Sequence, residues 1–349
     1  MKIGKLPEQV LVRSVIKKIS HRRDEVLFGP GVGRDCAALK LAEDEIFVIS
    51  SDPITGTVKD IGSHCIHITA NDLAAAGAEP VAVMVTALLP PETEEKDLRG
   101  IVEDMEKTCA ALDMEVIGGH TEVTDTVRQP LLSVTGVGKM KAGEALYEKK
   151  LKAGQDLVVT KWIGLEGTSI VAKERAQKLR EVFAESFVRT AQGFDQYLSV
   201  LPESRIAMEH GVSVMHDITE GGIFGALWEL AQGADVGLDV DLKKIPIRQE
   251  TVEVCEQFGL NPYLLMSSGA MLIGTEQGEV LVRKLGEAGI PGTVIGQAVE
   301  GNSRILRNGE EIRYLDRPQS DELYKIYQMG KTPERVLNRN RRGETKWRS

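Results

Sequence analysis

The alternation of apolar and polar positions is most informative in residues 59–81, which read KDIGSHCIHITANDLAAAGAEPV. Ile61, Cys65 and Ile68 follow one another at spacings of four and three, which places them on one face of a 3.6-residue helix. Asp72 falls next on the same stripe. An unpaired buried carboxylate is costly and usually takes up a proton or finds a cation. Asp72 is therefore either a residue at the helix end or rim, paired with a Lys or Arg, or part of a functional site.

The remaining pattern of the first half predicts helices and strands in alternation. Residues 92–112 are amphipathic, follow two prolines and carry acid in their first turns, which is typical of a helix. The β-branched run 81–89 predicts a buried strand. We expect helices at 7–19, 59–80 and 92–112, strands at 45–50, 81–89, 115–117 and 131–138, and a glycine loop at 29–39.

The chain turns polar and charged around residues 141–154, where we place a domain boundary. Beyond it we expect a strand at 156–160, a long charged helical region at about 169–191, a strand at 212–215 and a helix from Gly222 through Ala231. Residues 238–299 alternate short strands and helices. The segment from 331 onward holds seven Lys or Arg against two Glu, which favours a solvated tail over an arm that binds RNA or an acidic partner.

Length and composition narrow the class of protein. A chain of 349 residues is too long for one ordinary core, so two domains are expected. A net charge of −9 argues against a general nucleic-acid surface. The four cysteines are scattered without a CxxC pair, which fits a reducing compartment better than a disulfide framework or a zinc site. No run approaches membrane-spanning length, so we expect a soluble cytoplasmic protein.

Candidate chemistry gathers where predicted strands end. Asp52 follows the strand 45–50, Gly118-Gly119-His120 follow 115–117, and Asp217 with the turn Gly221-Gly222 follows 212–215. Loops of this kind bind ligands beyond the carboxyl ends of strands in open α/β sheets. Glycines admit phosphate oxygens to backbone N–H groups, and carboxylates beside a phosphate require a bridging cation. The acids at positions 35, 52, 72 and 217 therefore suggest Mg²⁺ bridging a nucleotide triphosphate.

Each of these features has an ordinary structural alternative when taken alone. GPGVGRDCA lacks the ending of a Walker A loop and no clear strand precedes it. Asp52 and Asp217 could be helix or turn caps, and His120 could be a hydrogen-bonded turn residue. Lys161 could be a solvated lysine at a strand end. The combination, rather than any single motif, indicates a site.

The series GRDCAAL, ISSDPITG, ITANDLAAAGAEPV, IGGHTEV and HDITEGGIFGALWELA resembles, in order and spacing, the PurM-like (AIR synthase-related) superfamily. The resemblance covers about residues 1–300 and is nearest to the HypE branch of hydrogenase-maturation proteins; thiamine-phosphate kinase is another member. It implies a two-domain fold of α/β and α+β character. An N-terminal α/β ATP-binding domain, 1–145, would pair with its copy in a homodimer, and a C-terminal α+β domain, 150–315, would precede a basic tail, 330–349.

The resemblance also implies Mg²⁺-ATP held between the domains. It implies that Asp35, Asp72 and Asp217 hold the metal, with Asp52 and Asn71 as neighbours of the site and Gly221 and Gly222 facing phosphate. A basic group should stabilise the transferred phosphoryl group, and Lys5, Arg34 and Lys161 are candidates. The full expected set is Lys5, Gly33, Arg34, Asp52, Asn71, Gly118, Gly119, Gly221 and Gly222 for ATP, and His120 and Lys161 for catalysis.

The expected activity is phosphorylation or activation of an oxygen of a small molecule or a partner-protein group by ATP, with release of ADP. HypE proteins end in a cysteine that they modify, whereas this sequence ends GETKWRS and its last cysteine is Cys255, so modification of a terminal thiol is not expected. Two alternatives stay open. One is a small-molecule kinase like thiamine-phosphate kinase, and the other is a nucleotide-binding protein that has lost catalysis and acts through partners. The expected partners of the chain are its own copy and a maturation partner protein.

Overall fold

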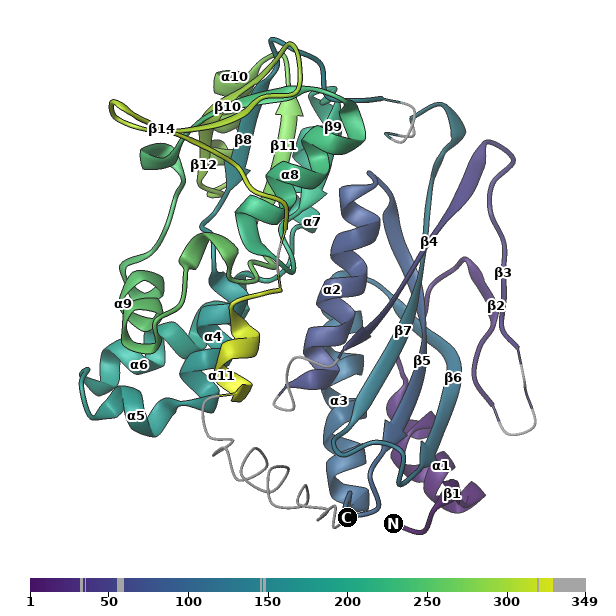
Figure 1. Cartoon of the computed structure of the whole chain (residues 1–349). Coiled ribbons are helices and arrows are strands. Elements are labelled where there is room, and N and C mark those ends of the chain that lie inside the picture. The colour runs from purple at the N-terminus through teal and green to yellow at the C-terminus, as the bar shows by residue number, and fades with distance from the viewer. Residues whose placement is uncertain are drawn as a thin grey trace, which may run out of the picture.

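The computed structural model describes residues 1–31, 34, 36–54, 60–144, 146, 149–318 and 320–328. Figure 1 shows two bodies side by side, each a β-sheet with helices packed against it, with α2 between them. No helix of these residues is long and apolar enough to cross a membrane. The arrangement is the expected mixed α/β and α+β fold.

The first body contains, in the described residues, a five-stranded sheet of order β1-β6-β5-β7-β4. Only the β5–β6 pair is parallel; the other neighbours run antiparallel. A short hairpin, β2–β3, stands beside it. The elements are β1 (Gly4–Lys5), α1 (Glu8–Ser14), β2 (Val26–Phe28), β3 (Ala38–Leu39), β4 (Glu45–Ile54), α2 (Ile61–Ala75), β5 (Glu79–Leu89), α3 (Glu95–Leu112), β6 (Glu115–Val123) and β7 (Leu131–Lys141).

The helix with the unusual carboxylate is α2, and it is shorter than the pattern predicted. It ends at Ala75 because Gly77 takes a left-handed conformation with φ of 83°. Ala78 N–H then bonds to Leu73 C=O and Gly77 N–H to Ala74 C=O, the two bonds of a Schellman cap. Residues 79 and 80, predicted as the end of the helix, begin β5 instead. The apolar stripe itself is confirmed, with Ile61 and Cys65 fully buried.

The second body contains, in the part of the chain that is described, a seven-stranded sheet of order β14-β13-β10-β12-β8-β11-β9. The predicted long helix at 169–191 is broken into three pieces. The elements are β8 (Asp156–Thr160), α4 (Leu165–Glu174), α5 (Ala176–Arg180), α6 (Glu185–Gln192), α7 (Leu201–Glu209), β9 (Val214–Asp217), α8 (Gly222–Ala234), β10 (Gly237–Asp241), α9 (Gln249–Phe258), β11 (Met271–Thr275), α10 (Gly278–Glu287), β12 (Gly292–Val299), β13 (Arg304–Asn308), β14 (Glu311–Tyr314) and α11 (Leu323–Gln328).

Buried polar contacts join the two bodies through α2. Asn71 donates its side-chain N–H to Leu198 C=O at 2.8 Å and accepts from Val200 N–H at 3.0 Å. Ser204 Oγ donates to Ala74 C=O at 2.7 Å. All three of these side-chain groups lie in buried surroundings, where an unmade hydrogen bond is expensive. The bodies are therefore held in one relative position by directed bonds as well as by apolar packing.

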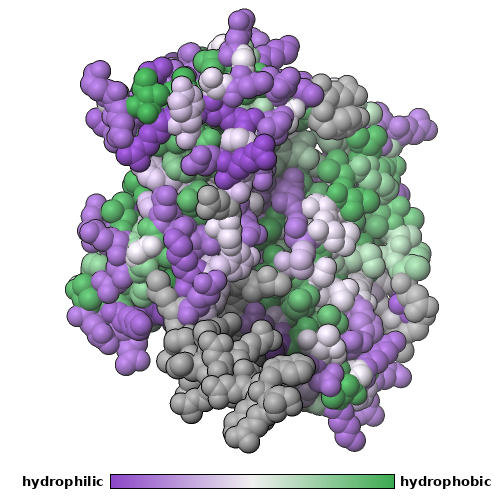
Figure 2. Space-filling model, viewed as in Figure 1, coloured by the Kyte–Doolittle hydropathy of each residue, from purple (hydrophilic) through white to green (hydrophobic). Residues whose placement is uncertain are grey.

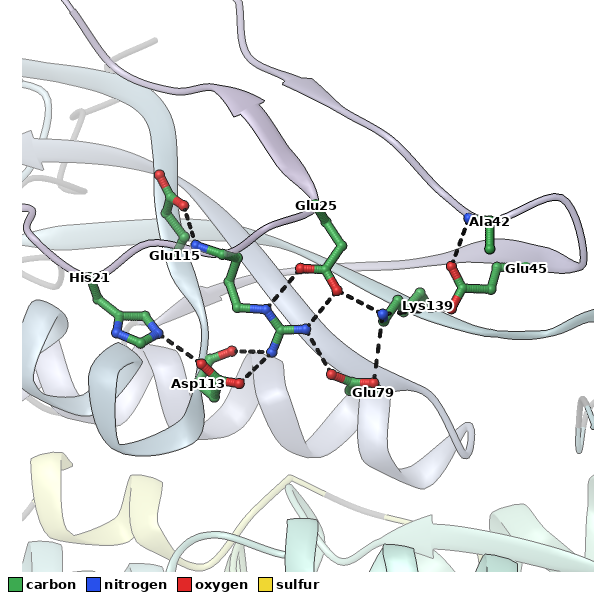
Figure 3. Close-up of polar contacts among 9 residues, drawn as sticks. His21, Glu25, Ala42, Glu45, Glu79, Asp113, Glu115 and Lys139 are labelled. Carbon is green, nitrogen blue, oxygen red and sulfur yellow. Dashed lines mark hydrogen bonds and ion pairs between the residues drawn. The ribbon is translucent and has the colours of Figure 1, made fainter.

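A network of charges fastens the segment before β2 to the first sheet (Figure 3). The Arg23 guanidinium bonds to Glu25 at 2.9 and 3.0 Å, to Glu79 at 2.7 Å and to Asp113 at 2.7 Å. Lys139 Nζ adds an ion pair of 2.6 Å to Glu25. The Arg23 side chain is only 8% exposed. The resulting bonds lower the pKa of Glu25 to about 2, with Arg23 the largest cause.

The outer face of the first sheet is apolar and lies open in the single chain. Along β4, Phe47 and Ile49 point away from α2 and are 45% and 64% exposed. Leu27 and Phe28 of β2 are also exposed, at 62% and 45%. Figure 2 shows hydrophobic side chains gathered on this side of the molecule, to the right in the view. Exposed apolar patches of this kind mark surfaces that another molecule covers.

Candidate functional site

Asp52 and Asp72 meet where α2 packs against β4. Ser50 and Asp52 occupy alternate positions of β4 on its inner face. Ser50 Oγ donates a hydrogen bond of 2.5 Å to Asp72 Oδ2. Burial, then the neighbouring carboxyl of Asp52 and the charge of Asp217, raise the pKa of Asp72 from 3.8 to about 8. No Lys or Arg among the described residues pairs with Asp52 or Asp72, so no protein cation there stabilises the ionised form of either carboxyl.

Asp217 is the third acid and closes β9. It is 6% exposed, and its Oδ2 is buried without a hydrogen-bond partner in the described part of the chain. Burial raises the pKa of Asp217; the neighbouring His216 opposes that shift, and Asp52 adds to it. A buried carboxylate oxygen without a partner is rare in folded proteins and calls for a ligand.

Asp52 and Asp72 line a cavity of about 200 Å³ between the two bodies. Asp217 is not in its lining, but its charge acts on Asp72. The walls of the cavity come from far apart in the sequence: β4 and α2 on one side, and α4, the turn after β9 and α11 on the other. The polar and charged side chains that line it are Asp52, His64, Asp72, Glu166, Thr219, Glu220, Ser268 and Tyr324.

The chemistry of the donor set fits Mg²⁺ bound together with phosphate. Mg²⁺ prefers oxygen ligands and is usually held by one or two carboxylates, with phosphate oxygens and waters completing its shell. Asp52, Asp72 and Asp217 supply crowded carboxylates whose repulsion such an ion would relieve. Among the described residues, no group of three or more His, Cys, Asp or Glu is arranged to hold a metal by itself. A shared site, completed by a nucleotide, matches both observations.

The turn Gly221-Gly222 opens α8 close to this cavity. Gly221 and Gly222 have φ of 83° and 60°, and a Cβ on Gly222 would lie 2.6 Å from Tyr263 C=O, so only glycine fits there. Gly221 N–H, expected to face phosphate, donates instead to Asp321 Oδ2 at 2.7 Å. Asp321 Oδ1 also accepts from Leu323 N–H at 2.8 Å, which anchors α11 and holds Tyr324 in the cavity wall.

Two expected site residues are occupied by structural contacts. Lys161 is buried, and its Nζ pairs with Glu203 at 2.7 Å and donates to two carbonyl oxygens, of Tyr197 and Ser199. Burial lowers the pKa of Lys161. Asn71 joins the two bodies, as described above. These contacts favour structural roles for both residues over the expected contact with ATP.

Five other expected residues gather elsewhere, around a second cavity of about 330 Å³ beside β6: Lys5, Arg34, Gly118, Gly119 and His120. Gly119 and Asp52 lie in one row of the sheet, joined through Val85 and Val134. Three strand spacings separate them, or about 14 Å. His120 Nε2 contacts Glu122 at 3.0 Å rather than any of the three acids. Gly33 and Asp35 lie outside the described residues.

Two groups of residues predicted to follow the ends of strands lie inside strands instead. Asp52 lies inside β4, and Gly118, Gly119 and His120 lie inside β6, because both strands are longer than their apolar runs. Gly119 is required by close strand packing, since a Cβ there would lie 1.9 Å from Val85 C=O. The sheet is also mostly antiparallel, so a common carboxyl edge does not exist. Asp217 alone follows the expected placement, at the end of its strand.

His64 and Glu166 also line the cavity of about 200 Å³, and neither was predicted from the sequence. His64, Ile68 and Asp72 repeat at spacings of four along α2, and all three line the cavity. That spacing was available as a signal for His64. Glu166 had no such local signal, because it contacts His64 across a separation of 102 residues in the sequence.

The comparisons with known proteins place the chain among AIR synthase-related proteins. The family described as AIR synthase related protein, N-terminal domain, matches residues 33–140, and its C-terminal domain matches residues 152–307. The chain is 28% identical to the hydrogenase expression/formation protein HupE of Azotobacter chroococcum, over 89% of this chain and 93% of HupE. It is also 28% identical to carbamoyl dehydratase HypE of Rhodobacter capsulatus, over 71% of this chain and 72% of HypE.

Solved structures show the same fold at lower identity. The hydrogenase-maturation protein HypE in complex with ATP superposes with a TM-score of 0.76 at 18% identity, covering 92% of this chain and 97% of HypE. Thiamine-monophosphate kinase of Stenotrophomonas maltophilia superposes with a TM-score of 0.70 at 20% identity, covering 89% of this chain and 99% of the kinase. A HypE–HypF complex gives 0.64 at 18% identity, covering 78% and 90%. With both family domains present in order, the chain belongs to the AIR synthase-related proteins and resembles HypE.

Proposed function

We propose that this protein binds Mg²⁺-ATP at the cavity between its two bodies and uses it to phosphorylate or activate an oxygen of a small molecule or a partner-protein group, releasing ADP. The observation that carries the proposal is the group of acids at Asp52, Asp72 and Asp217, held close together with one buried oxygen unpartnered. That arrangement is unfavourable without a cation. A HypE of the same fold binds ATP, which supports the choice of nucleotide.

In this proposal Asp52, Asp72 and Asp217 hold the Mg²⁺, whose charge offsets that of the phosphates and of the phosphoryl group in transfer. The protein's own contribution is position and exclusion of water. Tyr324 and Thr219 complete the wall of the cavity from the second body, so a bound nucleotide is enclosed by residues of both. Asp35, implied by the resemblance as a further ligand, stays a prediction.

Thermal unfolding with ATP, with and without Mg²⁺, tests the proposal. Ligand at about 100 times its Kd adds roughly 2.7 kcal/mol, a shift of a few degrees. We expect the shift with Mg²⁺-ATP and its loss when EDTA removes the metal. Equal melting temperatures under all conditions would refute nucleotide binding at this cavity.

The products distinguish the proposal from its alternatives. An activating enzyme releases ADP, and with water as the only acceptor it also releases phosphate. A small-molecule kinase, as thiamine-monophosphate kinase of the same fold is, gives ADP and a stable phosphorylated product, with thiamine phosphate the first compound to test. A nucleotide-binding partner protein binds Mg²⁺-ATP and forms no ADP with any acceptor.

We further propose that the protein forms a homodimer through the open apolar face of its first sheet. Phe47 and Ile49 lie on that face, and hairpin β2–β3 beside it adds Leu27 and Phe28 (Figure 2). Sedimentation of the parent and of Ile49→Glu tests this: the variant should sediment as a monomer. The HypE–HypF complex suggests that, besides its own copy, this chain also binds a maturation partner protein. We expect such a partner to carry the acceptor group.

A further inference from the structure

His64 and Glu166 form a buried pair at the wall of the candidate ATP cavity. His64 lies on α2 in the first body, and Glu166 lies in the first turn of α4 in the second. His64 Nε2 and Glu166 Oε1 are 2.5 Å apart, and the two residues are 8% and 5% exposed. Both line the cavity that also holds Asp52 and Asp72. None of the expected roles in the site includes either residue.

The bonds of Glu166 select the tautomer of the neutral imidazole. Glu166 Oε2 accepts a hydrogen bond from Ser268 N–H at 3.2 Å, and Oε1 faces His64. Burial acts to raise the pKa of Glu166, but the His64 ring and the Ser268 hydrogen bonds outweigh it and leave that pKa below its usual range. An ionised carboxylate can only accept, so Nε2 must carry the proton. In the neutral ring, Nδ1 is then the nitrogen with a free lone pair.

That tautomer makes His64 a base at the place where one is needed. The three aspartates are committed to a metal in the proposed function, so they are poor proton acceptors there. Among the described residues, no group makes a hydrogen bond to His64 Nδ1. A carboxylate behind an imidazole orients the ring and stabilises its protonated form, which is the arrangement of acyl-transfer triads. Imidazole is also the side chain most often used as a general base.

We propose that His64, oriented by Glu166, accepts the proton of the oxygen that attacks the γ-phosphate of ATP, water included when no other acceptor is bound. The step rests on the proposed function. The acceptor oxygen forms a bond to the γ-phosphorus, and the bond from that phosphorus to the bridging oxygen of ADP breaks. The acceptor's proton moves to His64 Nδ1, and the imidazolium later releases it to solvent. His64 is thus a catalytic residue and Glu166 a positioning residue.

A purely structural ion pair is the competing explanation. The two bodies already share the bonds of Asn71 and Ser204, so His64 and Glu166 are not needed to join them. Glu220 is the other candidate base, since it also lines the cavity, but it is exposed and its side chain bonds to the Tyr324 hydroxyl rather than to a carboxylate. The experiment therefore has to separate transfer from folding, and His64 from Glu220.

The experiment measures Mg²⁺-ATP binding by calorimetry and ADP formation with water as the acceptor, for the full chain. His64→Gln should bind Mg²⁺-ATP with the parent's Kd and keep the parent's KM, while its kcat falls about 100-fold. His67→Gln is the matched control, with the same substitution one turn further along α2 and outside this cavity. It should turn over as the parent does. Glu220→Gln, a change in the cavity wall, should lower kcat much less than His64→Gln does.

A spectroscopic measurement tests Glu166 without relying on turnover. In protein labelled with ¹⁵N-histidine, the signal lost in His64→Gln identifies His64 among six histidines. The His64 signal of the parent should show the tautomer protonated at Nε2. Glu166→Gln should shift His64 toward the tautomer protonated at Nδ1, and it should lower kcat at unchanged KM. This variant also serves if His64→Gln fails to fold. A His64 protonated at Nδ1 in the parent would overturn the proposal.

A parent that does not bind Mg²⁺-ATP refutes the proposed function itself. A parent that binds it but forms no ADP with water leaves nucleotide binding standing and overturns the proton-acceptor role. Turnover of His64→Gln within two-fold of the parent, loss of its nucleotide binding, or a 100-fold loss in Glu220→Gln instead would each assign His64 to structure and overturn the proposal.

Discussion

Replacing Asp72 by Asn should stabilise the protein without metal and remove its response to Mg²⁺-ATP. The substitution keeps the size of the side chain and removes a charge that Asp52 and Asp217 oppose. It also leaves an amide that can still meet Ser50, so the fold should be preserved. Stability and ligand binding should therefore move in opposite directions, which few structural substitutions produce.

The magnitude follows from the displacement of the pKa. Burial and the neighbouring acids raise the pKa of Asp72 from 3.8 to about 8, and each pH unit is worth about 1.4 kcal/mol, which sets a ceiling of roughly 6 kcal/mol. Because the cavity is partly open to solvent, water screens the repulsion, and we expect about 2–3 kcal/mol. The sign is set by protons: between pH 4 and 8 the folded parent holds a proton that the unfolded chain releases. Stability of the parent in EDTA therefore falls as pH rises through that window.

Urea unfolding of parent and Asp72→Asn in EDTA, at pH 5 and pH 8, measures this difference directly. The variant should be more stable than the parent by about 2–3 kcal/mol at pH 8 and by much less at pH 5. Asp316→Asn, at an exposed position, is the control and should follow the parent. A variant that loses stability equally at both pH values, or that still gains a Mg²⁺-dependent shift with ATP, would refute the placement of Asp72 among uncompensated acids at the metal.

Other substitutions test separate parts of the structure. Arg23→Ala leaves Glu25, Glu79 and Asp113 without their shared cation and should lower the free energy of unfolding in urea by about 2 kcal/mol. Arg23 keeps the pKa of Glu25 low and so stabilises the protein above about pH 4.5. Acid unfolding should therefore begin at higher pH in the variant. Gly119→Ala places a Cβ against Val85 C=O and should lower stability by about 3 kcal/mol or more, or abolish soluble expression. Asp321→Ala deprives Gly221 N–H of its acceptor, should cost about 1–3 kcal/mol, and should expose α11 to limited proteolysis; unchanged cleavage would show that Asp321 does not anchor this helix.

The sequence supported the fold and part of the site, and the reasons for each miss are physical. Asp72 could be predicted because helical periodicity is local, and a charge on an apolar stripe is visible without tertiary structure. The lengths of β4 and β6 could not be predicted, because pairing with neighbouring strands extends both strands beyond their apolar runs. Glu166 could not, because its partner is set only when the two bodies meet.

The resemblance to a family also grouped residues into one expected ATP site that lie far apart in a single chain. Asp52 lies beside the 200 Å³ cavity, whereas His120 and Arg34 line the cavity beside β6. Motif order along the sequence says which residues matter to a family, but it does not say which of them one chain brings together. That information comes only from strand order, which places β5 and β7 between β6 and β4.

The placement of Tyr324 in the wall of the cavity has a consequence for synthesis on the ribosome. Asp52 and Asp72 can reach their positions once the first body has emerged, because domains fold as units from the N-terminus. Tyr324 is translated some 250 residues after Asp72, and its helix is anchored through Asp321 to a turn made about 100 residues earlier. A nascent chain therefore carries the acids long before the site can close over a nucleotide. If the proposed function holds, a nascent chain that has not reached α11 lacks one wall of the cavity and should hold ATP more weakly than the 349-residue chain.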